Sequence, residues 1–248
     1  MKNYWRELLL LLIVLISFVG MMLPEPIRQS LAYHNFADQR PWLGIPNFLN
    51  VASNLPFLFV GVVGQIFCWR NRPAEAPWSW TIFFLGVTLV ALGSGYYHWS
   101  PSSETLVWDR LPMTIGFMGL FIGILTEHVS ERLEKTLLIP ALLLGFASVM
   151  YWDYADDLRF YAWIQLIPLL TIPVVLLLFP GRYTHQRYLM YALVFYLLAK
   201  YFEAYDAEIY AFTKQVIGGH SIKHVSAAVG SFFIYLMLRR RLPRCGHR

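Results

Sequence analysis

Long apolar stretches separated by short polar connections dominate the chain. Each stretch approaches the roughly 20 residues that a helix needs to cross a bilayer. Eight stretches are predicted as transmembrane helices: about Leu8–Leu23, Asn47–Trp69, Trp80–His98, Leu106–Leu125, Thr136–Trp152, Phe160–Phe179, Tyr188–Phe202 and His220–Leu238. Pro, Gly and charged residues mark the connections, which leave no room for a soluble domain. The pattern predicts an all-α polytopic membrane protein with eight spans.

The first apolar stretch has the layout of a signal peptide, because Lys2 and Arg6 precede it. However, the stretch is long for a signal peptide, and Met21-Met22-Leu23-Pro24 follows where a cleavage site would need small residues. We therefore expect an uncleaved first helix.

Composition agrees with a membrane protein, since 57% of the residues are hydrophobic and 14% are charged. Soluble domains carry about 25% charged residues. The net charge of +5 does not indicate nucleic-acid binding, because five arginines crowd the C-terminal tail, where anionic lipid is the expected partner. Cys68 and Cys245 both fall on the predicted cytoplasmic side, so we expect no structural disulfide.

The placement of Lys and Arg predicts the orientation. With the N-terminus inside, the inner face collects most of the basic residues: Lys2, Arg6, Arg70, Arg72, Arg132, Lys135, Arg182, Arg187 and the tail arginines. The connection between the fifth and sixth spans lies outside and is acidic, with Asp153, Asp156 and Asp157. Eight spans then leave both termini in the cytoplasm.

This topology brings polar side chains from three spans to a similar depth near the outer surface. Ser94 and His98 end the third span, Asp109 begins the fourth, and His220 and His224 begin the eighth. The two last histidines stand at i and i+4, on one face of a helix. Ionisable side chains within a membrane span are costly and mark a functional site by default.

The chemistry of these residue types favours a zinc site. Three neutral imidazoles plus one water form the open coordination of catalytic Zn²⁺, and Asp109 could accept the proton of that water. The Ser94 hydroxyl could donate to a developing oxyanion, although it could also bond a carbonyl one turn back. His220 and His224 alone would fit ordinary packing equally well. The presence of His98 and Asp109 at the same depth favours one metal ion.

Other polar residues near the outer end have less specific interpretations. We expect His34 to be a solvated loop histidine and Lys223 to extend toward the surface. Lys200 and Glu203 fit an intrahelical pair, and Glu203 or Asp206 could support the site. Asn50 and Asn54 repeat at i and i+4, as expected for hydrogen bonds between helices.

The order and spacing of these motifs resemble the alkaline ceramidases. The motifs are S-x-x-x-H ending one helix, D-x-L-P eleven residues after that histidine, and H-x-x-x-H opening the last helix. The segment 47–54 also resembles the start of the first family helix, and the resemblance covers about Asp38 to Leu238. It implies a seven-helix bundle in which His98, His220 and His224 bind zinc, Ser94 and Asp109 complete the site, and ceramide is hydrolysed to sphingosine and fatty acid. Progestin and adipoQ receptors, haemolysin-III-like proteins and lipid-remodelling proteins belong to the same superfamily.

The sequence also departs from this family. The resemblance makes the first helix an addition to the seven family helices. It implies three parts: residues 1–30 with the added helix, a catalytic domain over residues 31–240, and a basic tail over residues 241–248. Eukaryotic relatives carry an acidic calcium site before the first family helix. Here Asp38 is the remaining acidic candidate and Asn47 replaces a glutamate, so Ca²⁺ binding is an open question. The additional residues that could support either site are Asp38, Asn47, Asn50, Asn54 and Asp206.

The predicted function is zinc-dependent cleavage of the amide of ceramide or phytoceramide, with a membrane lipid as the partner and no nucleic acid. The active site would lie near the extracytoplasmic face. Two alternatives stay open. The same site could hydrolyse an acyl ester during lipid remodelling, or the chain could be a receptor-like protein with a structural zinc ion. The sequence does not indicate the oligomeric state.

Overall fold

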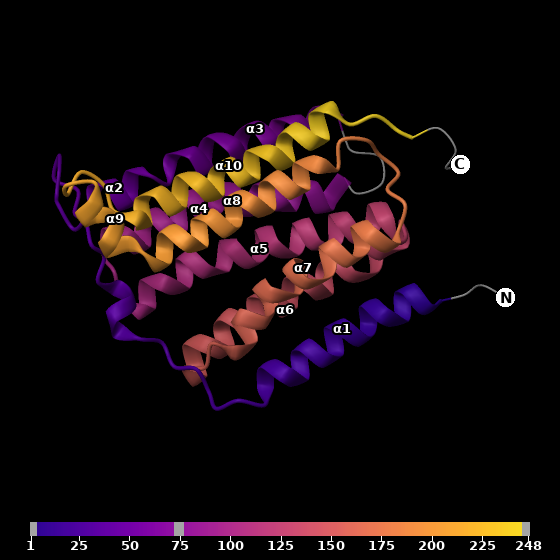
Figure 1. The fold of residues 1–248 in the computed structure, drawn as a ribbon, viewed down its shortest axis with the longest axis horizontal. Helices are drawn as coiled ribbons and strands as arrows, with labels where there is room; N and C mark the ends of the chain where they lie inside the picture. The colour runs from indigo at the N-terminus through magenta and orange to yellow at the C-terminus, as the bar shows by residue number, and fades with distance from the viewer. Residues whose placement is uncertain (1–3, 72–76, 245–248) are drawn as a thin grey trace.

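A computed structural model describes residues 4–71 and 77–244, which form helices and connecting loops. Figure 1 shows long helices running side by side in a bundle, with α1 along one flank. Lys2, Arg72, Cys245 and Arg248, which the sequence analysis used, lie outside the described residues. The elements in order are α1 (Trp5–Met22), η1 (Leu31–His34), α2 (Phe48–Ala52), α3 (Leu55–Asn71), α4 (Pro77–Trp99), α5 (Ser103–His128), α6 (Arg132–Ala155), α7 (Arg159–Leu178), α8 (Arg187–Ala204), α9 (Asp206–Phe212) and α10 (Gly219–Arg240).

The protein is an all-α polytopic membrane protein. Among the described residues, seven helical stretches are long and apolar enough to cross a bilayer: α1, α2 with α3, α4, α5, α6, α7 and α10. The seventh predicted span, Tyr188–Phe202, corresponds to α8 and is not one of these seven helical stretches, because Arg187, Lys200 and Glu203 lower the hydropathy of an 18-residue helix. It nevertheless packs along α10 in the bundle (Figure 1). A crossing by α8 therefore stays a prediction.

Some boundaries differ from those predicted. The second apolar stretch is two helices, because the chain turns at Ser53 and Asn54 before Pro56 enters the first turn of α3. A proline is tolerated there, since the first turn of a helix needs no N–H donor. The fifth stretch is longer than expected, because the charged turn at Arg132–Lys135 is already helical. The short helix α9 was not predicted.

Glycines let α4 and α5 approach closely. A Cβ on Gly93 would clash with the Trp108 carbonyl oxygen, and one on Gly119 would lie 2.6 Å from the Phe83 nitrogen. Small residues at such a contact allow helices in a membrane to pack backbone against backbone. The contact at Gly93 aligns the end of α4 with the start of α5, where Ser94 and Asp109 lie.

The segment 27–40, which we call the strap, crosses the end of the bundle that carries the histidines. The Leu158 N–H donates to the Ile27 carbonyl (2.8 Å), and the Gln29 N–H donates to Asp156 (2.9 Å). Further along, the Ala37 N–H donates to Asp206 (2.9 Å). These bonds attach the strap to the connection between α6 and α7 and to the start of α9, which are distant from it in sequence.

Candidate metal centre and lipid cavity

His98, His220 and His224 form a buried cluster. His98 lies at the end of α4 and is fully buried, while His220 and His224 occupy the first two turns of α10. The His98 Nε2 atom is 3.2 Å from His224 Nε2 and 3.3 Å from His220 Nε2. All three ring nitrogens lie within 4.8 Å of one another, so the cluster has the geometry to hold a metal ion.

Hydrogen bonding between the rings does not account for this arrangement. An imidazole Nε2 carries either one hydrogen or one lone pair, so it can serve one neighbour. The His98 Nε2 atom has two neighbours at hydrogen-bond distance. Four ligands at about 2.0–2.1 Å around a tetrahedral zinc ion stand roughly 3.3 Å apart. The observed spacings match that value, so the donor set fits zinc.

Neighbouring groups contact the three histidines. Ser53 Oγ lies 2.8 Å from His224 Nδ1, and the Asn47 side chain donates to the His98 carbonyl at 2.9 Å. Phe36 of the strap packs against His98 and His220, each at 4.6 Å between ring centres. The cluster is therefore held from α2 and shielded by the strap.

Asp206 anchors the beginning of α10. Its carboxylate accepts from the His220 N–H at 2.8 Å and from the Ala37 N–H at 2.9 Å, which joins α9, α10 and the strap. A Cβ on Gly219 would clash with the Phe202 carbonyl, so glycine is required for α10 to start this close to α8. Asp206 thus supports the site through the backbone of His220 and contacts no ligand nitrogen.

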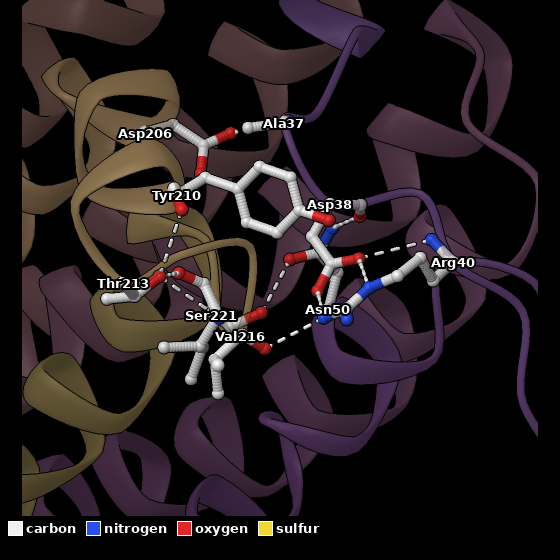
Figure 2. Close-up of polar contacts among 10 residues, drawn as sticks. Ala37, Asp38, Arg40, Asn50, Asp206, Tyr210, Thr213, Val216 and Ser221 are labelled. Atoms are coloured by element: carbon white, nitrogen blue, oxygen red, sulfur yellow. Dashed lines mark hydrogen bonds and ion pairs between the residues drawn. The ribbon is translucent and has the colours of Figure 1, made fainter.

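Figure 2 shows the polar contacts around Asp38, Asn50 and Ser221. The Asn50 amide donates to the Asp38 carbonyl at 3.0 Å, and its oxygen accepts from the Ser221 hydroxyl at 2.7 Å. Asn50 therefore links α2, α10 and the strap, as expected of an asparagine that bonds between helices. Asn54 instead donates to the Asn50 carbonyl within its own segment, at 2.8 Å.

The Asp38 carboxylate is paired with Arg40. Arg40 Nε and Nη2 donate to its two oxygens, each at 2.8 Å, and Nη2 also donates to the Val216 carbonyl at 2.7 Å (Figure 2). Burial raises the pKa of Asp38, but the hydrogen bonds and charge of Arg40 outweigh burial and lower it. Since one guanidinium engages both oxygens, Asp38 is not available to a calcium ion in this arrangement.

A cavity of about 260 Å³ extends from the histidines into the bundle. Ser94, Asp109 and His224 line its polar end, and side chains of α4, α5, α7, α8 and α10 line its apolar remainder. The Ser94 side chain interacts with the Asp109 carboxylate. All five residues predicted for the site therefore gather at one end of the bundle, and three of them face the cavity.

Two minor predictions were wrong. His34 is not a solvated loop residue: its Nδ1 lies 2.9 Å from the Tyr97 hydroxyl and its Nε2 lies 3.2 Å from Ser103 Oγ. Burial, and next the charge of Arg110, lower the pKa of His34. Lys223 does not extend to the surface, because its side chain is 17% exposed and donates to Glu203 at 2.9 Å.

Two residues that contact the histidines, Ser53 and Phe36, were not predicted from the sequence. Ser53 follows Asn50 at i+3, so a closer inspection of that helical face would have included it. Nothing in the local sequence signals Phe36, because its contact with the histidines depends on the path of the strap.

Comparison with known proteins identifies the family. A model of the Ceramidase family matches residues 44–241, which includes every residue of the histidine cluster. No curated protein matches the chain. The match excludes α1 and the whole strap. The chain therefore belongs to the ceramidase family, which supports a ceramide-hydrolysing function in general.

Proposed function

We propose that the protein is a zinc-dependent amidohydrolase that cleaves the amide of ceramide or phytoceramide, releasing a sphingoid base and a fatty acid. The convergence of three buried Nε2 atoms beside Ser94 and Asp109 carries this proposal. Three histidine ligands leave one position open, as in catalytic rather than structural zinc sites. His98, His220 and His224 would hold the zinc ion, which would supply the acidification of a bound water to a pKa of about 7 and hence a nucleophile at neutral pH.

The roles of Asp109 and Ser94 follow from their place at the polar end of the cavity. An Asp109 oxygen accepts a proton from the attacking water and delivers it to the nitrogen that leaves the carbonyl carbon. The Ser94 hydroxyl donates to the carbonyl oxygen as negative charge develops on it. One water is consumed, the C–N bond breaks, and an amine and a carboxylic acid form.

The cavity suits a lipid that enters from the bilayer. Its long walls are apolar, with Val87 on α4, Phe117 and Leu120 on α5, and Ile172 and Leu176 on α7. α8 packs chiefly against α10, whereas α7 packs against α1, α5 and α6. The cavity lies where these two groups of helices separate, and the strap covers the end above the histidines. We therefore propose lateral entry, with the acyl chain in the apolar part.

We also propose an orientation of the protein in the membrane. α1 begins and α10 ends at the end of the bundle away from α2 and α9 (Figure 1). Arg6, Arg70, Arg239 and Arg240 belong to that end. The positive-inside rule makes it cytoplasmic and places the histidines near the extracytoplasmic face. We also propose that α1, with the residues up to 30, is an addition to the catalytic bundle of residues 31–240, since the family match begins at residue 44 and leaves α1 out.

The test is lipid turnover by purified protein with and without a zinc chelator. We expect ceramide to yield free fatty acid, the chelator to stop the release, and added zinc to restore it. If fatty acid is released from an acyl ester and not from ceramide, the substrate is the ester of the second candidate function, since the same site can attack either carbonyl. Bound zinc without release from any acyl lipid would favour the receptor-like alternative.

A further inference from the structure

A second polar cluster lines the cavity beside the histidines. Glu203 of α8 accepts from Lys200 at 2.7 Å, from Lys223 of α10 at 2.9 Å and from the Tyr33 hydroxyl at 3.1 Å. Glu203 and Lys223 are each 17% exposed, and both face the cavity together with Lys200. Charged groups at this depth are costly, so they mark a candidate binding site rather than a solvated surface.

The cluster offers hydrogen-bond donors to the cavity. Glu203 already accepts three bonds, whereas the Lys223 ammonium, with three N–H groups, makes one hydrogen bond among the described residues. The group left for a ligand is therefore a cationic donor next to His224. Its natural partner is an acceptor on the lipid.

The charges favour an anionic acceptor. Lys200 and Lys223 share one carboxylate, so the cluster carries an excess positive charge. Asp109 is the other acidic residue that lines the cavity, and the reaction proposed above makes it take up a proton. An anion on the ligand would then balance the second lysine. A hydrogen bond between two charged groups is also roughly twice as strong as one between neutral groups.

We propose that Lys223, positioned by Glu203 and assisted by Lys200, is a head-group subsite that selects N-acyl lipids with an anionic group near the acylated nitrogen. Carboxylate, phosphate and sulfonate share the required chemistry. This inference rests on the proposed amide hydrolysis and extends its substrate class from neutral ceramides to N-acyl lipids with an anionic head group. The competing account is that the ion pair only joins α8 to α10.

The experiment compares kcat/KM for ceramide and for ceramide 1-phosphate in the wild type, Lys223→Met and Lys223→Arg. A hydrogen bond between charged groups is a strong one, so we expect the wild type to favour the phosphate by about 10-fold or more. Lys223→Met should abolish that preference, and Lys223→Arg should retain most of it. Lys214→Met is the matched control, because it removes an exposed lysine that does not line the cavity.

Binding separates this inference from the proposed function. Retention of each lipid is measured by native mass spectrometry on Asp109→Asn protein, with and without Lys223→Met, and zinc content is measured alongside. Phosphate-dependent retention that is lost with Lys223→Met supports the subsite even if no variant hydrolyses any lipid, a result that would overturn the proposed function. A different result would overturn the subsite and leave the proposed function intact: the wild type hydrolyses ceramide normally, and Lys223→Met lowers kcat/KM by the same factor for both lipids.

Discussion

Buried ionisable side chains occupy both ends of the helical bundle, and the two ends differ in whether those side chains are paired within the protein. At the end away from the histidines, Glu127 accepts from Trp80 Nε1 (2.6 Å) and from Arg241 Nη1 (2.5 Å). Glu134 accepts from the Trp78 and Ser79 N–H groups at the start of α4 (3.1 and 2.7 Å). These carboxylates are fully used in holding helices together.

At the histidine end, polar groups converge without satisfying one another. Three ring nitrogens point at one place, and Lys223 and Asp109 face a cavity. Burial of an ionisable group in a membrane helix therefore does not by itself identify a functional site. A site is indicated where buried donors and acceptors share a cavity and have capacity left for a ligand.

The largest expected effect is on catalysis at the histidine end. Asp109→Asn removes the proton acceptor and should lower kcat by about 10²–10⁴-fold. Zinc content and thermal stability should change little, because the amide is isosteric with the carboxylate. Ceramide turnover and bound zinc are measured on the same preparation. Unchanged turnover would assign the proton transfer to another group.

The opposite end should respond in stability rather than in rate. Arg241→Met removes the guanidinium that offsets the buried Glu127 carboxylate, and such a loss costs about 3–5 kcal/mol. We expect a lower unfolding temperature in detergent and an unchanged kcat for the protein that stays folded. Adding Glu127→Gln should recover much of the loss, because no charge then stays buried. A fall in kcat with no loss of stability would break the comparison between the two ends.

A smaller effect is expected at Ser53, which lies 2.8 Å from His224 Nδ1. Groups that bond the second nitrogen of a ligand histidine contribute about 10–100-fold in metal affinity. Ser53→Ala should therefore weaken zinc binding, measured by competition with a chelator, with little change in stability. Ser148→Ala is the control, since that buried hydroxyl bonds a carbonyl within α6 at 2.7 Å. Equal zinc affinity in both variants would remove Ser53 from the site.

The smallest effect is the pH dependence of the strap. Burial and the charge of Arg110 lower the pKa of His34 in the folded state, so the unfolded chain binds more protons just below pH 6.5. Stability should therefore fall as the pH drops through about 6.5 and level off below the folded pKa. His34→Gln should flatten this part of the profile of unfolding temperature against pH. An identical profile in the variant would contradict the assignment.

The sequence predicted those parts of the site that depend on local spacing. His220 and His224 share a helix face because they are one turn apart, and the apolar pattern placed His98 and Asp109 at the same end of the bundle. The spans were predicted for the same reason, since hydropathy is a property of each segment. α8 shows the limit of that reasoning, because Glu203 lowers its hydropathy although it is paired with Lys200 and Lys223 within the protein.

Contacts between distant segments could not be predicted in this way. The pairing of Lys223 with Glu203 depends on the packing of α8 against α10. The position of Lys223 in the sequence does not indicate which face of α10 lines the cavity. The same is true of Phe36, whose position over the histidines follows from the path of the strap. The bond between Asp206 and the His220 N–H likewise needs the turn that α9 makes, which no apolar pattern signals.

The most direct test of the central claim is zinc analysis with X-ray absorption at the zinc edge. Wild-type protein purified without chelators should hold about one zinc per chain, with three imidazole nitrogens at about 2.0–2.1 Å. His98→Ala should lose the metal, because the His98 side chain is one of the three that converge at the cluster. The helical content should persist. Wild-type protein without bound zinc, or with a zinc ion that His98→Ala retains unchanged, would contradict the account.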